Sequence, residues 1–119
     1  MPLFELIAEP EVVDFLVHLN PTDRARADFA ASLLAEFGTT LSEPYSKYLG
    51  DGVRELRFTI SNGAAVRITY WLPGGPLAIL LTVFTKTRQR EIREVDRAKL
   101  AKKVCETNHD RTYHNVFTV

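Results

Sequence analysis

The sequence predicts an α+β protein in which an N-terminal helical hairpin packs on a small antiparallel β-meander, followed by a basic C-terminal helix. Three observations predict this class. Apolar residues recur with the period of a helix before Pro44, and with a period of two between residues 53 and 84. A stretch rich in Arg and Lys, again with helical spacing, follows. The chain has 119 residues, 45% of them apolar and 25% charged, which is typical of one globular domain.

Proline, capping residues and apolar spacing predict the first two helices. Pro10 suits a first helical turn, and one apolar face follows at Val12, Phe15, Leu16 and Leu19. Asn20 is the expected N-cap before Pro21, and Gly38 ends the second helix. The core-facing stripe of the second helix is expected to contain Phe29, Ala30, Leu33, Leu34 and Phe37. Because their connection is so short, the two helices are expected to be antiparallel.

Three strands are predicted after the hairpin, at residues 53–60, 64–72 and 77–84. In the first, Leu56, Phe58 and Ile60 alternate with polar residues, which gives the strand one apolar face. Asn62 and Gly63 carry the signal of a tight hairpin turn. The third strand is apolar on both faces, as expected for a strand that is covered on both sides.

A last helix is predicted from about residue 88 to residue 104. Its narrow apolar seam is expected to consist of Ile92, Val95, Ala98, Ala101 and Val104. Cys105 continues this seam and is expected to be a buried structural thiol with a raised pKa. Residues 1–105 are expected to form a single domain, and residues 106–119 a C-terminal tail of unknown role.

Charge is segregated along the chain although the net charge is zero. Residues 1–43 carry a net charge of −6, residues 44–103 one of +7, and the remaining residues −1. This asymmetry favours a partner of opposite charge, either nucleic acid or an acidic protein surface. The alternative is that the two halves of one domain neutralise each other.

The composition also limits the compartment and the cofactors. The single cysteine cannot form an internal disulfide, and no Cys/His cluster has the spacing of a zinc site. No apolar run has the length of a membrane helix, and the basic start of a secretory signal is missing. We therefore expect a cytoplasmic protein without a metal or cofactor.

Strand alternation gathers basic residues on one face of the predicted sheet. Arg57, Arg67 and Trp71 lie on the face away from the helices, and Lys86 follows the third strand. Like charges repel, so a phosphate group would explain their gathering, with Trp71 or Phe84 stacking on a base. The alternative is a solvated face on which nearby carboxylates, Glu55 among them, neutralise the two arginines.

Four short motifs occur in order along this part of the chain. The first consists of Lys47, Leu49, Gly50, Gly52, Glu55, Leu56 and Arg57. The others are Arg67-Ile68-Thr69-Tyr70, Phe84-Thr85-Lys86 and Glu91-Ile92. In this order and spacing the sequence resembles the RelE/ParE toxin superfamily, specifically its HigB-like branch with phage-derived relatives. In place of a second lysine and a Thr-Pro found in many relatives, this chain has Thr87-Arg88-Gln89-Arg90.

The resemblance implies a RelE-like fold and the toxin of a type II toxin–antitoxin module. Such toxins are endonucleases that cut mRNA on the ribosome, with the 2′-hydroxyl of the RNA as nucleophile and without a metal. The implied partners are a cognate antitoxin, expected to be a helix-turn-helix protein, the ribosome and mRNA. The alternatives are a ParE-like gyrase poison and a non-catalytic relative that binds nucleic acid or protein.

The same resemblance suggests roles for the basic residues. Arg57 and Arg67 are expected to contact the scissile phosphate, and Lys86 to stabilise charge or act as a general acid. The RNA-binding residues are expected to be Lys47, Trp71, Arg88 and Arg90. Tyr70 matches the family pattern, but strand alternation points it into the core, so a structural role is expected.

Overall fold

The computed structural model describes residues 3–87, 91–108 and 115–117, and it confirms the predicted fold class. The helices are α1 (Pro10–Val17), α2 (Pro21–Phe37) and α3 (Glu91–Asn108), with a short 3-10 turn, η1, at Gly38–Thr40. The strands are β1 (Glu5–Ala8), β2 (Ser46–Gly50), β3 (Val53–Thr59), β4 (Ala65–Trp71), β5 (Leu77–Thr85) and β6 (Asn115–Phe117).

The sheet is larger than the predicted meander. Its strand order is β2-β3-β4-β5-β1-β6, and the four strands β2 to β5 form the antiparallel meander. β1 lies parallel to β5, with Glu5 opposite Leu77, and β6 lies antiparallel to the other edge of β1. The predicted antiparallel meander is therefore present, and the sheet is extended by β1 and β6, which were not predicted; β1 is inserted beside a strand that follows it much later in the chain. α3 extends beyond Cys105 to Asn108, and residues Asn115–Phe117 form β6.

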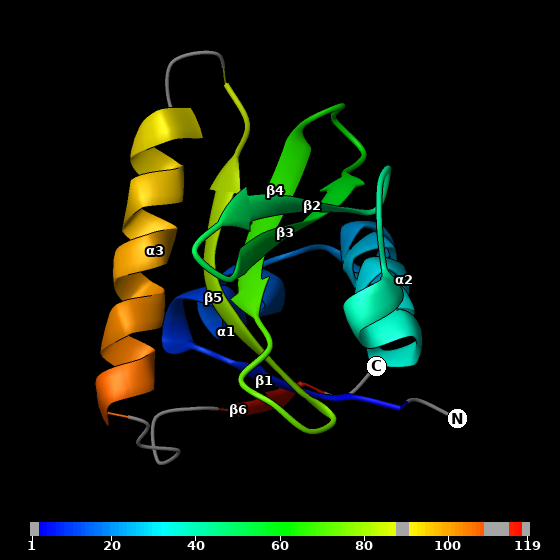
Figure 1. The fold of residues 1–119 in the computed structure, drawn as a ribbon. Coiled ribbons are helices and arrows are strands. Elements are labelled where there is room, and N and C mark those ends of the chain that lie inside the picture. The colour runs from blue at the N-terminus through cyan, green and yellow to red at the C-terminus, as the bar shows by residue number, and fades with distance from the viewer. Residues whose placement is uncertain (1–2, 88–90, 109–114, 118–119) are drawn as a thin grey trace.

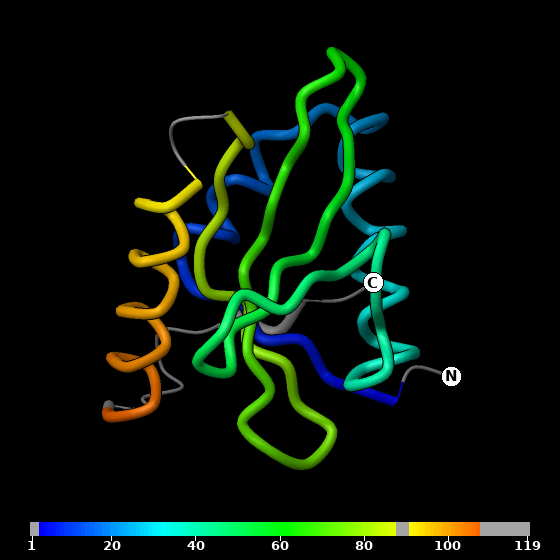
Figure 2. The backbone as a smooth tube through the Cα atoms, turned by 45° about the horizontal axis from the view of Figure 1, so that its top comes forward, coloured from blue at the N-terminus to red at the C-terminus, as the bar shows by residue number. Residues whose placement is uncertain are grey.

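The two layers of helices cover opposite faces of the sheet (Figures 1 and 2). We call the side covered by α1 and α2 the hairpin face, and the side that carries Arg57 and Arg67 the arginine face. On the hairpin face the helices pack on buried strand residues that include Leu56, Tyr70 and Leu80. On the arginine face α3 covers a smaller cluster of Trp71, Ile79, Leu81 and Cys105.

The two N-terminal helices form as predicted, but the buried stripe of α2 differs. The Asn20 side chain accepts a hydrogen bond from the Asp23 N–H at 2.8 Å, which is the expected N-cap. Phe29 and Phe37 are 61% and 47% exposed, so the expectation that they are core residues was wrong. The buried stripe consists of Ala27, Ala30, Ala31, Leu34 and Ala35. These small side chains let α2 lie close to the large side chains of the sheet.

α3 is rotated relative to the predicted seam. Ile92 and Val104 are 79% and 52% exposed, whereas Ala98 and Cys105 are buried. The prediction that Ile92 and Val104 face the protein was therefore wrong, and the prediction of a buried Cys105 is confirmed. Burial raises the pKa of the Cys105 thiol, the direction expected for a structural cysteine. The expected start of this helix at residues 88–90 lies outside the described residues.

Candidate phosphate-binding face

The two arginines predicted to bind phosphate are direct neighbours across β3 and β4. Arg57 and Arg67 are register partners, so their side chains lie on the same face, and Phe84 of β5 lies opposite Arg67. Arg54 belongs to the other face of β3, where its guanidinium lies 5.3 Å from the centre of the Tyr48 ring. The predicted juxtaposition of Arg57 and Arg67 is confirmed.

A buried carboxylate lies between the two guanidinium groups. Glu55 has a fully buried side chain, and its Oε2 lies 3.4 Å from Arg57 Nε and 3.6 Å from Arg67 Nε. Neither carboxylate oxygen and neither Nε makes a hydrogen bond to any described residue. The alternative interpretation, a face neutralised by nearby carboxylates, required Glu55 to pair with the two arginines. These ion pairs are present, but they are loose and lack hydrogen bonds.

Burial and charge shift the pKa values of this cluster. Burial raises the pKa of Glu55 even though Arg67 and Arg57 act in the opposite direction. Burial lowers the pKa of Arg67, and repulsion from Arg57 lowers it further, whereas Glu55 and Glu91 act to raise it. Glu55 and Arg67 are therefore each less well stabilised in the charged form than they would be in water. An added anion would improve the environment of both arginines.

The two candidate lysines lie at the borders of this cluster. Lys47 is the register partner of Glu55 on β2, and its side chain is exposed. Lys86 follows β5, its N–H donates to the Ala65 carbonyl at 2.8 Å, and its side chain is exposed. The structure therefore groups Lys47 with the arginines through Glu55 and places Lys86 one position beyond the end of β5. Arg88 and Arg90 lie outside the described residues.

The candidate stacking aromatics are covered. Trp71 and Phe84 are only 8% and 7% exposed, and Lys102 Nζ of α3 lies 5.1 Å from the centre of the Trp71 ring. A base could stack on Trp71 only if α3 moved away. The sequence shows Trp71 on the correct face but contains no local signal that α3 packs there.

Tyr70 has the structural role expected from strand alternation. It is fully buried on the hairpin face, and its hydroxyl lies 2.6 Å from the Ser46 hydroxyl. Burial raises its pKa, which keeps the phenol in its neutral form.

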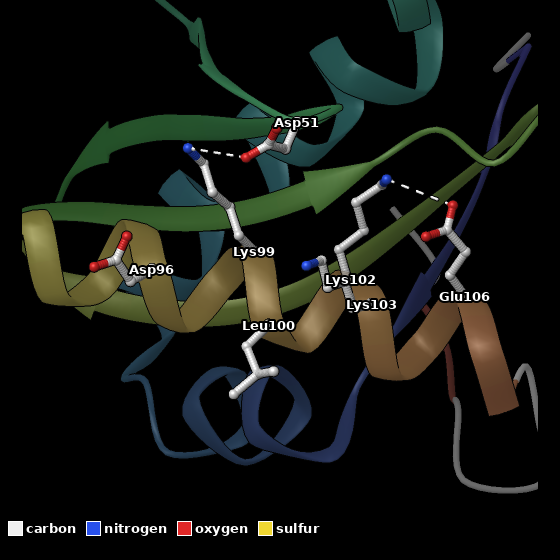
Figure 3. Close-up of a pocket in the computed structure, with 7 residues that line it drawn as sticks. All are labelled: Asp51, Asp96, Lys99, Leu100, Lys102, Lys103 and Glu106. Atoms are coloured by element: carbon white, nitrogen blue, oxygen red, sulfur yellow. Dashed lines mark ion pairs between the residues drawn. The ribbon is translucent and has the colours of Figure 1, made fainter.

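The Gly-rich turn between β2 and β3 is the point where α3 contacts the edge of the meander (Figure 3). Lys99 pairs with Asp51 at 3.3 Å, and a Cβ at Gly50 or Gly52 would lie only 3.2 Å from an atom of Lys99 or Lys102. Both glycines also have left-handed φ angles of 100° and 79°. The Leu-Gly-x-Gly motif therefore has a structural explanation. Two of the lysines that line the pocket in Figure 3 are paired with acids: Lys99 with Asp51, and Lys102 with Glu106 at 3.5 Å.

A second carboxylate–arginine pair joins α3 to α1 and β5. Arg97 donates to both oxygens of Glu11, with Nη1–Oε1 2.7 Å and Nη2–Oε2 2.8 Å. The same Glu11 carboxylate accepts the Val83 N–H at 2.9 Å, and Arg97 also pairs with Glu94 at 2.9 Å. This arrangement satisfies the charges fully and fixes one side of α3 against β5.

Within the described part of the chain, no group of three His, Cys, Asp or Glu side chains is placed to hold a metal ion. The helices in the same described ranges are all too short or too polar to span a membrane.

The α+β fold, with a helical hairpin on one side of a meander and a helix on the other, is consistent with the RelE-like fold. The sequence matches the model of the family described as phage derived protein Gp49-like (DUF891) over residues 14–104, so the chain belongs to this family. The family is a RelE-like toxin-type family associated with the toxins of toxin–antitoxin modules. Among curated proteins, none matches the chain significantly.

Proposed function

We propose that this protein is the toxin of a type II toxin–antitoxin module and that it cuts mRNA bound to the ribosome. The observation that carries the proposal is the pair Arg57 and Arg67, which share one buried carboxylate without hydrogen bonds to it. Family membership supports the toxin role and an antitoxin partner. The HigB-like motifs support the ribosome and mRNA as the target.

In the proposed reaction the 2′-oxygen of one ribose attacks the adjacent phosphorus. The 2′-hydroxyl gives its proton to solvent, the 2′-oxygen forms a bond to phosphorus, the bond from phosphorus to the 5′-oxygen breaks, and that oxygen takes up a proton. Arg57 and Arg67 would stabilise the negative charge of the pentavalent phosphorane. Lys86, exposed at the end of β5, would stabilise charge or protonate the leaving oxygen, and Lys47 would bind the RNA backbone.

The products of cleavage test this chemistry directly. Purified protein treated with EDTA and then added to programmed ribosomes should cut mRNA and leave 2′,3′-cyclic phosphate or 3′-phosphate ends. Lys86→Ala should slow cleavage without lowering stability, because the side chain is exposed. Products with 3′-hydroxyl ends, or a requirement for an added transition metal, would contradict the mechanism.

One observation favours a second candidate, a non-catalytic relative that binds protein or nucleic acid. Glu55 already neutralises part of the arginine charge, as a purely structural cluster would require. Expression in cells separates the candidates. The endonuclease should arrest translation and produce mRNA fragments, a gyrase poison should cause DNA damage, and a non-catalytic protein should be harmless.

A further inference from the structure

An exposed tyrosine, Tyr45, lies beside the paired arginines, in the turn directly before β2. The Arg57 N–H donates to the Tyr45 carbonyl at 2.9 Å, and Ser46 is the register partner of Leu56. Tyr45 therefore lies opposite Arg57 in the ladder. Residues that face each other across antiparallel strands have Cα atoms about 5 Å apart.

Strand alternation assigns Tyr45 to the arginine face. Its neighbour Ser46 belongs to the hairpin face, because the Ser46 hydroxyl contacts that of the buried Tyr70. Successive residues of a strand alternate between faces, so Lys47 belongs to the opposite one. Tyr45 lies one residue before β2, and its hydrogen bond with Arg57 extends the ladder to it, so the same alternation assigns it to the arginine face. Tyr45 thus continues the row of Arg57, Arg67 and Phe84, which lie on β3, β4 and β5.

Exposure distinguishes Tyr45 from the other aromatic residues of this face. Tyr45 is 46% exposed, whereas Trp71 and Phe84 are covered. A nucleobase can use an aromatic ring as a stacking platform only when the ring is accessible, and stacking does not depend on the identity of the base.

We infer that Tyr45 is the base-stacking residue of the arginine face and contacts a nucleobase of single-stranded RNA whose phosphate lies on Arg57 and Arg67. The inference rests on the proposed function in taking RNA as the ligand. Tyr45 then has the base-stacking role that the sequence suggested for Trp71 or Phe84. The bound RNA would cross the arginine face from the β4–β5 side toward β2.

The test compares RNA with and without bases. The probes are a short single-stranded RNA and an oligomer of the same length made of abasic riboses, which keeps the phosphate charge. The wild-type protein should bind the normal RNA more tightly than the abasic one. Tyr45→Ala should weaken binding of the normal RNA about 5- to 100-fold and leave the abasic oligomer unchanged. Tyr45→Phe should bind like the wild type, since it retains the ring.

Tyr48→Ala is the matched control. Tyr48, a residue of β2, is 55% exposed, but its ring lies under Arg54 on the other face. Tyr48→Ala should therefore bind both probes as the wild type does. An unchanged preference for bases in Tyr45→Ala, or an equal loss in Tyr48→Ala, would overturn the inference.

A cleavage assay on programmed ribosomes with the same variants separates this inference from the proposed function. If binding depends on bases through Tyr45 but no mRNA is cut, Tyr45 is a stacking residue and the proposed endonuclease activity is contradicted. If Tyr45→Ala changes neither the rate of cleavage nor its KM, the proposed endonuclease activity stands and the stacking role of Tyr45 is excluded. Failure of the wild-type protein to bind either probe or to cut would contradict both.

Discussion

The structure contains two carboxylate–arginine clusters, and they differ in how completely their charges are satisfied. Glu11 and Arg97 form two short hydrogen bonds, and the carboxylate accepts a third from the Val83 N–H. Glu55 lies deeper, contacts two arginines at 3.4 and 3.6 Å, and makes no hydrogen bond to any residue in the described ranges. The more exposed cluster is therefore the better satisfied one.

On the proposed function, this difference separates a structural contact from the phosphate-binding site. A saturated ion pair such as Glu11–Arg97 has no donor directed toward a ligand, and its geometry explains how α3 is held. A buried pair with unused donors is poor for stability, because the cost of desolvation is not recovered in hydrogen bonds. An unsatisfied cluster of this kind is where an incoming phosphate would gain most.

The largest expected effect comes from removing one arginine of the Glu55 cluster. Arg67→Ala should reduce mRNA cleavage about 100- to 1,000-fold, the usual consequence of losing one donor to a charged transition state. Arg67 is only 8% exposed, so the variant should also lose about 1–3 kcal/mol of stability through the weakened pairing of Glu55. Cleavage rates and urea unfolding measure the two effects.

Two further variants separate activity from stability at this position. Adding Glu55→Gln to Arg67→Ala removes the unpaired charge, so stability should recover while cleavage does not. Arg54→Ala changes an arginine of the same strand on the opposite face and should leave cleavage near the wild-type rate. Wild-type cleavage in a well-folded Arg67→Ala variant would exclude Arg67 from the site.

A smaller effect, on stability alone, is expected at the Glu11 cluster. Arg97→Ala should lower the free energy of unfolding by about 1 kcal/mol, because both side chains are partly exposed and solvent screens the pair. The loss should shrink at high salt, and hydrogen exchange should accelerate in α3. Arg93→Ala, at an exposed position of the same helix, should change neither. A large loss of cleavage in Arg97→Ala would show that the two clusters are not independent.

The smallest expected effect is a difference in pH dependence. Burial acts to raise the pKa of Glu11, but the hydrogen bonds from Arg97 and Val83 outweigh it and lower the pKa overall. Its contribution to stability is present above the unfolded pKa of about 4.3 and is lost as the pH falls through the lower folded value. The pKa of Glu55 is raised, so its contribution is present below the unfolded pKa and is lost as the pH rises through the folded value.

The two carboxylates should therefore give pH slopes of opposite sign. Glu11→Gln should reduce the loss of stability that occurs as the pH falls. Glu55→Gln should remove the loss of stability that occurs as the pH rises from acid to neutral. Urea unfolding of both variants from pH 3 to pH 7 measures this, and slopes that change in the same direction would contradict the comparison.

Local periodicity was enough to predict the hairpin, the meander and the pairing of Arg57 with Arg67, because helix and strand periods are properties of neighbouring residues. It was not enough for β1, a strand of four residues whose place is decided by distant β5. Phe29 was misplaced because helical spacing does not tell which stripe of α2 faces the sheet, and the buried stripe consists mostly of alanines. The rotation of α3 depends on Arg97 and Glu11, which no short sequence window connects.

The candidate site was predicted in part for the same reason. Alternation along β3 and β4 is local, so the arginine face could be identified. The covering of Trp71 by α3 and the proximity of Tyr45 to Arg57 are contacts between separate elements. Neither has a signature in the spacing of residues.

The position of β1 also constrains how the protein is made. β1 is synthesised before every other strand of the described sheet, yet Glu5 pairs with Leu77 and Ala8 pairs with Asn115. During synthesis the first strand must wait for β5 and finally for the C-terminal segment before both of its edges are paired. The arginine pair, in contrast, belongs to a hairpin of consecutive strands that closes early. A nascent chain can therefore form the hairpin that carries Arg57 and Arg67 before its sheet is complete.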